Sequence, residues 1–311
     1  MVANWQHLVQ YYETDLAGIV HHSNYVRWFE EARTWLMNEM GYDYAKMEAD
    51  GVLVPVLAIS AQYKRMTRFG ETVNIAAKVE QFNGVTMSLS YEVTDLATGK
   101  VKATGTSQHA FLDKTSYRPL ALKRSLPAVH DLFVAQFEVD QAATGNADSS
   151  QTTASHSRRS RQSLPEIDFN GPSSVNTPHK VQVYETDQMA IVHHSNFLRL
   201  FEEARTDLMA QIGFTENHQA ELGILAALVK LSADYKTMIR FGESVDIQAR
   251  ISGVEGNQIH IAYQILDQAS GDLRSLGQTT LQAIDLGGDR NFKLAEAQPA
   301  LYTKLTELAA E

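Results

Sequence analysis

Apolar positions in the first third of the chain follow a helical period. They recur three or four residues apart, with Arg33 on the same face, at Val26, Phe29, Ala32 and Leu36. This spacing predicts a helix with one apolar face. Ser23 and Gly41 are typical of its N-cap and of its C-terminal glycine, and Ser195 and Gly213 are typical of the ends of a second such helix.

Further along the chain, apolar and polar residues alternate with the period of a strand. The alternation covers 73–79 and 85–93, and Asn83-Gly84 and Thr98-Gly99 supply turn residues. A short strand is also predicted to end near Tyr12. One central helix followed by long antiparallel strands predicts an α+β fold in which the sheet wraps around the helix.

The strongest pattern is an internal repeat. Residues 12–40 recur as residues 184–212 at an offset of 172, and 19 of those 29 positions are identical. The register continues without a gap to Asp113 and Asp285. Two copies of this length indicate a duplicated domain, with a first domain at 1–139 and a second at 179–311. Residues 140–178 are rich in Ser, Thr, Gln, Asn and Gly, which predicts a flexible linker.

Composition narrows the functional classes. The 311 residues carry a net charge of -10, which argues against general nucleic-acid binding. No apolar run is long enough to span a bilayer and no secretory leader is visible, so we expect no membrane association. The sequence has no cysteine, which excludes disulfides and a cysteine nucleophile and is consistent with a cytoplasmic location.

Candidate chemistry lies just before each predicted helix. The segments DLAGIVHHSN and DQMAIVHHSN place Asp15 and Asp187 a few residues ahead of a helix N-terminus. Free N–H groups and the helix dipole favour a developing oxyanion there, and a nearby carboxylate can act as general base or nucleophile. A purely structural role as helix caps stays open. The seven histidines outside these segments are expected to be surface or packing residues.

Residues 12–36 resemble the signature of the 4-hydroxybenzoyl-CoA thioesterase family, a Tyr-x-Asp-Thr-Asp pattern followed by Val-x-His-x-Asn-Tyr and Phe-Glu-x-Ala-Arg. The resemblance covers about 100 residues of each repeat. It implies a tandem hotdog that hydrolyses an acyl-CoA thioester, with each site completed by the opposite repeat. It implies no metal and no cofactor beyond the coenzyme A of the substrate.

The resemblance also implies site residues. The catalytic set is Asp15, Asp187, His22 and His194; the substrate and oxyanion set is Gly18, His21, Ser23, Asn24, His193, Ser195 and Asn196. Cations that flank a predicted strand and turn are candidates for coenzyme A phosphates, although solvated surface charges of this kind are common: Lys64, Arg65, Arg68, Lys236 and Arg240.

The two copies differ where backbone geometry matters. Gly18 becomes Ala190, which costs about 1 kcal/mol if the position has a positive φ. We therefore expect both sites to work but the first to be the better one. An acyl-carrier-protein thioesterase and a non-catalytic acyl-CoA sensor are the alternatives. The repeats are expected to form an intramolecular pseudo-dimer, and two chains to form a homodimer.

Overall fold

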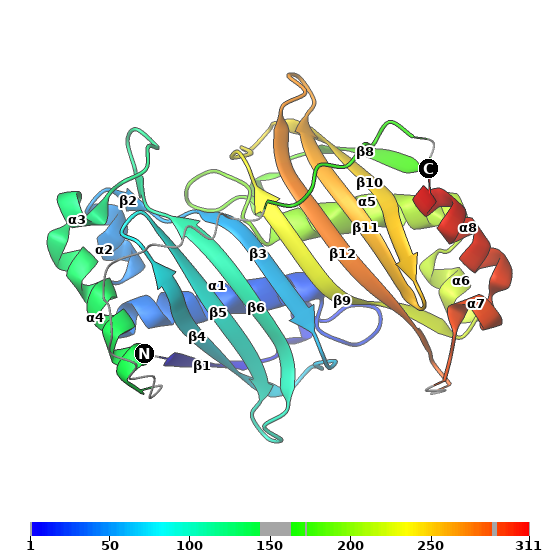
Figure 1. The fold of residues 1–311 in the computed structure, drawn as a ribbon, viewed down its shortest axis with the longest axis horizontal. Helices are drawn as coiled ribbons and strands as arrows, with labels where there is room; N and C mark the ends of the chain where they lie inside the picture. The colour runs from blue at the N-terminus through cyan, green and yellow to red at the C-terminus, as the bar shows by residue number, and fades with distance from the viewer. Residues whose placement is uncertain (1, 144–162, 172, 288–290, 311) are drawn as a thin grey trace, which may run out of the picture. The chain divides into compact units, whose positions relative to one another are not determined.

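The structure is a computed structural model that describes residues 2–143, 163–171, 173–287 and 291–310 (Figure 1). The chain divides into two compact units. The first comprises Met1–His21, Tyr25–Ile59 and Arg65–Ser163, and the second comprises His22–Asn24, Ser60–Lys64 and Leu164–Glu311. Two short pieces of the first repeat therefore group with the second repeat, and one of them is the predicted start of the helix.

The first repeat is an antiparallel sheet with a long helix. The strands follow the order β1-β4-β5-β6-β3, with bounds Val2–Leu8, Thr72–Phe82, Thr86–Asp95, Val101–Ala110 and Val56–Tyr63. The long helix α1 spans His22–Glu39. Smaller elements complete the repeat: a 3-10 turn at Tyr11–Glu13, α2 at Tyr44–Ala49, β2 at Val52–Leu53, β7 at Leu112–Asp113, α3 at Leu122–Ser125 and α4 at Pro127–Ala143.

The second repeat has the same order of elements. Its strands run β9-β12-β11-β10-β8, with bounds Ile224–Tyr235, Leu273–Asp285, Gln258–Asp267, Ser244–Glu255 and Ser174–Lys180. Helix α5 spans Asn196–Ile212 and is the counterpart of α1. The remaining elements are a 3-10 turn at Val183–Glu185, α6 at Glu216–Glu221, α7 at Leu294–Ala297 and α8 at Pro299–Ala310. Each repeat is a hotdog domain.

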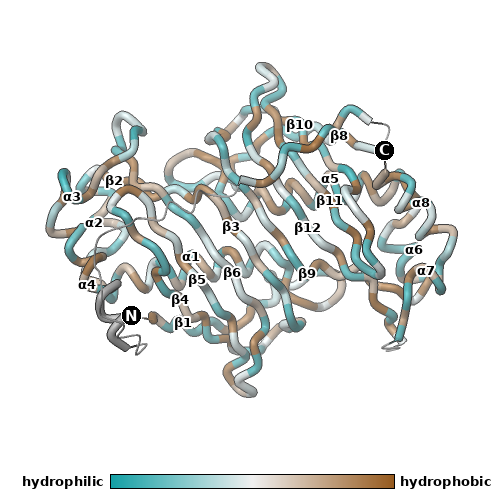
Figure 2. Tube along the Cα trace, viewed as in Figure 1, coloured by the Kyte–Doolittle hydropathy of each residue, from teal (hydrophilic) through white to brown (hydrophobic). Residues whose placement is uncertain are grey.

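The long helix of each repeat packs on the sheet through aromatic stacking. Phe29 of α1 stacks on Tyr91 of β5 with ring centroids 4.5 Å apart, and Phe201 stacks on Tyr263 at 4.8 Å. The helical face predicted from the sequence is buried throughout, Arg33 included. Figure 2 shows the alternation of hydrophobic and hydrophilic residues along the strands. The predicted α+β class and wrapped helix are confirmed.

Several predicted boundaries shift. Helix α1 begins at His22, so Ser23 lies inside the helix and its assignment as N-cap is wrong, whereas Ser195 is the N-cap of α5. Gly41 and Gly213 have the expected left-handed φ, at 78° and 79°. The first strand ends at Leu8 rather than near Tyr12, because residues 11–13 form a 3-10 turn.

The predicted linker lies mostly outside the described residues, but both of its ends are structured. Helix α4 continues to Ala143, and β8 begins at Ser174 instead of after 178. Ahead of β8, Phe169 is buried and the carbonyl of Asp168 accepts a hydrogen bond from Arg250 Nη1. The second repeat therefore uses residues that the low-complexity composition had assigned to the linker. No helix among the described residues is long and apolar enough to cross a membrane.

Candidate active site

The candidate loops have the same backbone geometry in both repeats. The N–H of Asp15 donates to Ile19 O at 2.9 Å, and the N–H of Gly18 donates back to Asp15 O at 2.9 Å. The equivalent bonds of Asp187 in the second loop, with Ile191 and Ala190, measure 3.0 Å each. These paired bonds make each loop a tight turn that projects the aspartate ahead of the long helix.

Each aspartate side chain is oriented by its own turn. Asp15 Oδ1 accepts the N–H of Ala17 at 2.9 Å, and Asp187 Oδ1 accepts the N–H of Met189 at 2.8 Å. Asp15 is exposed and Asp187 is half-buried. The turn engages one carboxylate oxygen, and for Asp15 the other has no hydrogen-bond partner among the described residues. These bonds close the aspartate's own turn and do not reach an N–H of the long helix, so they do not support the interpretation as helix caps and leave a chemical role open.

The start of α1 is held by a tyrosine. Tyr63 OH donates to His22 O at 3.0 Å, and Tyr235 OH donates to His194 O at 2.9 Å. Burial raises the pKa of the Tyr235 phenol well above its usual range, so this hydroxyl stays a donor. The sequence alone assigned neither tyrosine a role, although their recurrence at the repeat offset of 172 was an available signal.

Three predicted site residues of the first repeat lie at the start of α1: His22 of the catalytic set, and Ser23 and Asn24 of the substrate and oxyanion set. Within the second compact unit, Ser23 Oγ accepts a hydrogen bond from Arg199 Nε at 3.2 Å. His22, Ser23 and Asn24 are all buried. Their burial keeps the first turn of the helix away from bulk water. The N–H groups of this turn interact more strongly with a developing negative charge when water is excluded.

The helix start of the second repeat is arranged differently. The N–H of Asn196 donates to His193 O at 2.8 Å, and the N–H of Ser195 lies 3.3 Å from His193 Nδ1. The Asn196 side chain donates to Glu185 O at 2.8 Å. Two of the N–H groups near the predicted oxyanion position therefore have acceptors within the second repeat.

A glutamate beside each loop was missed by sequence reasoning. The carbonyl of Glu13 accepts the N–H of His21 at 2.9 Å, and its side chain accepts from His7 Nε2 at 2.9 Å. His179 and Glu185 repeat the side-chain contact at 3.0 Å. His7 and His179 lie at the repeat offset, so the treatment of these two histidines as mere surface or packing residues overlooked a signal in the sequence.

The candidate phosphate-binding cations lie in and around the loops after β3 and β9. Arg68 Nη1 donates to Gly18 O at 3.3 Å, which joins one of these cations directly to the aspartate loop. Lys64 and Arg65 are exposed, and Arg65 Nη1 donates to Val101 O at 2.9 Å. Lys236 Nζ lies 3.3 Å from Asp234 Oδ2. These contacts place the cations beside the loops and leave their role in binding a prediction.

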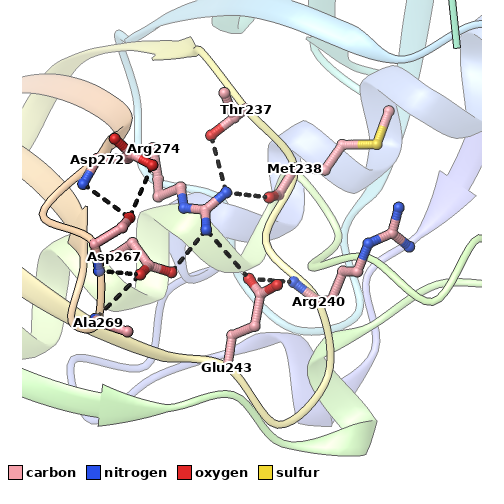
Figure 3. A network of polar contacts seen from close by, with 9 residues as sticks. Thr237, Met238, Arg240, Glu243, Asp267, Ala269, Asp272 and Arg274 are labelled. Carbon is pink, nitrogen blue, oxygen red and sulfur yellow. Dashed lines mark hydrogen bonds and ion pairs between the residues drawn. The ribbon is translucent and has the colours of Figure 1, made fainter.

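A cation on a neighbouring strand braces each of these loops, Arg274 in the second repeat (Figure 3) and the buried Lys102 in the first. Arg274 lies 2.7 Å from Asp267 Oδ2 and 3.9 Å from Glu243 Oε2, and it donates to Met238 O at 3.2 Å. In the first repeat, Lys102 at the equivalent position bonds the equivalent three residues, Glu71, Asp95 and Met66. Figure 3 shows the Arg240 side chain pointing away from this network, and Arg240 is exposed.

Comparison with known proteins identifies the family. A model of the Thioesterase-like superfamily matches residues 9–137 and 181–305, which together cover most of the chain and fall on the two repeats. The chain belongs to the Thioesterase-like superfamily. Each match of the superfamily model includes one complete aspartate loop and the long helix that follows it.

Named relatives match a part of the chain about as long as one repeat. A Bacillus subtilis protein with the name putative acyl-CoA thioesterase YneP is 37% identical over 125 residues, which are 40% of this chain and 90% of the relative. Acyl-CoA thioesterase YbgC of Haemophilus influenzae is 27% identical over 111 residues, covering 35% of this chain and 80% of its own.

Solved structures match the chain over both repeats. The crystal structure of a putative oleoyl thioesterase from Lactobacillus plantarum superposes with a TM-score of 0.71 at 18% identity, covering 91% of this chain and 97% of its own. The 12:0-ACP thioesterase from Umbellularia californica gives 0.69 at 11% identity, covering 91% and 94%. At these identities the likeness concerns the fold, and it agrees with a double hotdog.

Proposed function

We propose that the protein is an acyl-CoA thioesterase with one catalytic carboxylate in each repeat, Asp15 and Asp187. The observation that carries the proposal is the doubled loop, in which an oriented aspartate precedes a helix N-terminus in a chain of the Thioesterase-like superfamily. The acyl-CoA thioesterase names of relatives that match a whole repeat support the substrate class.

In the proposed reaction, the carboxylate attacks the thioester carbonyl directly or removes a proton from the attacking water. The carbonyl oxygen becomes an oxyanion, which the first N–H groups of the long helix stabilise. Where water attacks, collapse of the intermediate breaks the C–S bond, the protonated aspartate returns its proton to the departing thiolate, and the free acid and coenzyme A are the products. Where the carboxylate attacks, the same collapse releases the thiolate and leaves a mixed anhydride, which water hydrolyses to the free acid and the aspartic acid side chain; that side chain then gives its proton to the thiolate. His22 and His194 position the substrate or the water.

Coenzyme A carries phosphates, and the exposed cations next to each loop fit them. Arg68 and Arg240 follow the buried Thr67 and Ile239 on loops that Lys102 and Arg274 fix through ion pairs. A rigid loop presents an arginine to a phosphate with little loss of entropy on binding. We therefore assign the phosphate-binding role first to these two arginines.

The finer features stay proposals. The doubled signature supports the 4-hydroxybenzoyl-CoA thioesterase family as the subgroup. A homodimer of the chain and sites completed by the opposite repeat are predictions of the same resemblance, and a cytoplasmic location is a prediction from the absence of cysteine. An acyl-carrier-protein substrate is the second candidate, since matched full-length structures include a 12:0-ACP thioesterase.

Conservative variants separate chemistry from capping. Asp15→Asn and Asp187→Asn keep an oxygen that can accept the turn N–H but remove the carboxylate. We expect each single variant to lose the turnover of its own site and the double variant to lose at least about 100-fold in kcat. Asp113→Asn is the matched control, since Asp113 is half-buried, as Asp187 is, and accepts the N–H of Ser116 in a comparable turn.

Thiol release from acyl-CoAs gives a clean assay because the protein has no cysteine. Full activity in the double variant would refute the carboxylate assignment. Hydrolysis of acyl-carrier-protein substrates with no hydrolysis of acyl-CoAs would favour the second candidate. Binding of acyl-CoA without release of any thiol would indicate a non-catalytic acyl-CoA sensor instead of an enzyme.

A further inference from the structure

His7 lies between two carboxylates on the strand that leads into the first aspartate loop. Its Nε2 is 2.9 Å from Glu13 Oε2 and its Nδ1 is 3.1 Å from Glu31 Oε2. Both ring nitrogens therefore face an acceptor. Only the imidazolium form can donate to both carboxylates at once, since a neutral imidazole has one N–H. The His7 side chain is 14% exposed, so water replaces few of these contacts.

Glu13 connects this histidine to the loop. Its Oε1 accepts Trp28 Nε1 of α1 at 2.8 Å, and its Oε2 accepts the N–H of Gln10 at 2.7 Å. Its carbonyl accepts the N–H of His21, at the far end of the aspartate loop. One buried residue thus joins β1, the 3-10 turn, the loop and the long helix.

The second repeat contains the same arrangement. His179 lies 3.0 Å from Glu185 Oε2 and 3.1 Å from Glu203 Oε2, and Glu185 O accepts the N–H of His193 at 2.9 Å. Leu200 stands where the first repeat has Trp28. The histidine and both glutamates persist although the tryptophan does not, so the histidine–carboxylate contact is the part common to both loops.

The charge balance at His7 favours the protonated ring. Burial alone would lower its pKa, but hydrogen bonds and attraction from Glu13 and Glu31 outweigh burial and raise the pKa to about 9. Although its own burial opposes the shift, the pKa of Glu13 is lowered by the bonds from His7, Gln10 and Trp28. On β4 the residue paired with His7 is Val73, which adds no charge.

We propose that His7 is a positioning residue for the proposed active site: as an imidazolium it holds Glu13, so that the Glu13 carbonyl keeps the loop from Asp15 to His21 in its working geometry. In the second repeat His179 makes the same contacts with Glu185 and Glu203, and Glu185 O accepts the N–H of His193. Loss of the imidazolium proton at alkaline pH loosens the loop and lowers turnover. The inference rests on the proposed function, because it assumes that the loop carries the catalytic aspartate.

The direction of the pH effect follows from the raised pKa of His7. Its stabilising contribution is complete below the ordinary histidine pKa of 6.5 and is lost as the pH rises through about 9. Glu31→Gln removes one carboxylate from His7 but keeps an oxygen that can still accept the hydrogen bond from Trp5 Nε1, and 40% of the Glu31 side chain is accessible. It should move the alkaline fall to lower pH, whereas His7→Gln removes the titrating group.

The test uses the Asp187→Asn background, in which only the first site turns over. We expect Glu31→Gln to shift the midpoint of the alkaline fall in kcat down by about one pH unit. We expect His7→Gln to lower kcat about 10-fold at pH 7 with little change in KM. His218→Gln is the matched control, because His218 also faces a glutamate, Glu221, but is exposed and far along the chain from the loop.

Hydrogen exchange of the loop amides is the readout that does not depend on activity. At pH 7, the His21 amide should exchange at least about 10-fold faster in His7→Gln than in the parent protein, at unchanged exchange of the β5 amides. An unchanged alkaline midpoint in Glu31→Gln, or unchanged exchange at His21 in His7→Gln, would overturn the inference. If the protein hydrolyses no acyl-CoA, the proposed function fails. The exchange experiment still tests whether His7 holds the loop through Glu13.

Discussion

Gly18 and Ala190, at equivalent positions of the two aspartate loops, share a left-handed backbone, with φ of 67° and 58°. The surrounding hydrogen bonds are the same within 0.1 Å. The loop therefore imposes its conformation on whatever residue occupies the position, and the alanine is strained where the glycine is not. The two repeats differ in strain rather than in backbone path.

Ala190→Gly should therefore stabilise the protein. Removing the Cβ relieves an alanine held at positive φ, and we expect a gain of about 1 kcal/mol in the free energy of unfolding. Urea denaturation measures the gain. Ala220→Gly, on the exposed face of α6, is the control and should lose a similar amount, because glycine weakens a helix. A loss in Ala190→Gly would show that the loop carries no such strain.

Sequence patterns predicted the long helices and the central strands but not the contacts that differ between the repeats. Helical spacing and strand alternation identified α1, β4 and β5 because each element has one face in the core. In the first repeat the ring centroids of Trp5 and Trp35 lie 5.4 Å apart. At the equivalent positions of the second repeat, Thr177 Oγ1 donates a hydrogen bond of 2.6 Å to Asp207 Oδ2. In the sequence, each of these two differences taken alone is a loss of apolar surface. Only the structure shows that the two positions contact each other in both repeats.

The site was predictable as a segment but not as a set of contacts. The aspartate, the histidines and the helix start are contiguous in sequence, so one motif contains them. The brace on Glu13 comes from His7 on a preceding strand, and the brace on the cation loop comes from Lys102 and Arg274 on a later strand. Long-range pairs of this kind depend on strand register, which residue spacing alone does not reveal.

Gly277 marks the closest approach of α5 to its sheet. A Cβ at this position of β12 would lie 2.4 Å from Phe201 Cε2, far inside van der Waals contact. Gly277→Ala should cost about 2 kcal/mol in the free energy of unfolding, since the buried phenyl ring has to leave its stack on Tyr263. Thermal and urea denaturation both measure this loss.

The matched control for Gly277 is Gly253→Ala, where the added Cβ would meet His260 Cδ2 at an ordinary 3.5 Å. This control should change stability by less than about 1 kcal/mol. Replacement of the ring by a smaller side chain relieves the clash. The Phe201→Leu, Gly277→Ala double variant should therefore lose less free energy of unfolding than the sum of the losses in the two single variants. Additive losses would contradict a direct clash between the two side chains.

Asp267 makes the second repeat sensitive to acid. The hydrogen bond from Arg274, with that from the N–H of Ser270, holds the pKa of Asp267 at about 2. Because the pKa in the folded state is lowered, its contribution is present above the ordinary value of 3.8 and is lost as the pH falls through about 2. Asp267→Asn should therefore destabilise the protein at pH 7 and differ little from the parent near pH 2. Urea midpoints at both pH values test this, and a constant difference would disprove the linkage.

Arg68 links the proposed phosphate site to the aspartate loop, because its guanidinium donates to Gly18 O and is otherwise exposed. In the Asp187→Asn background, Arg68→Gln should raise KM for acyl-CoA about 10-fold by removing a charge-assisted contact to phosphate. Arg65→Gln is the matched control and should change KM less, since Arg65 Nη1 already donates to Val101 O. The KM effect of Arg68→Gln should shrink at high salt and with an acyl-pantetheine substrate that lacks the nucleotide phosphates. An equal effect on the truncated substrate would assign Arg68 to loop geometry alone.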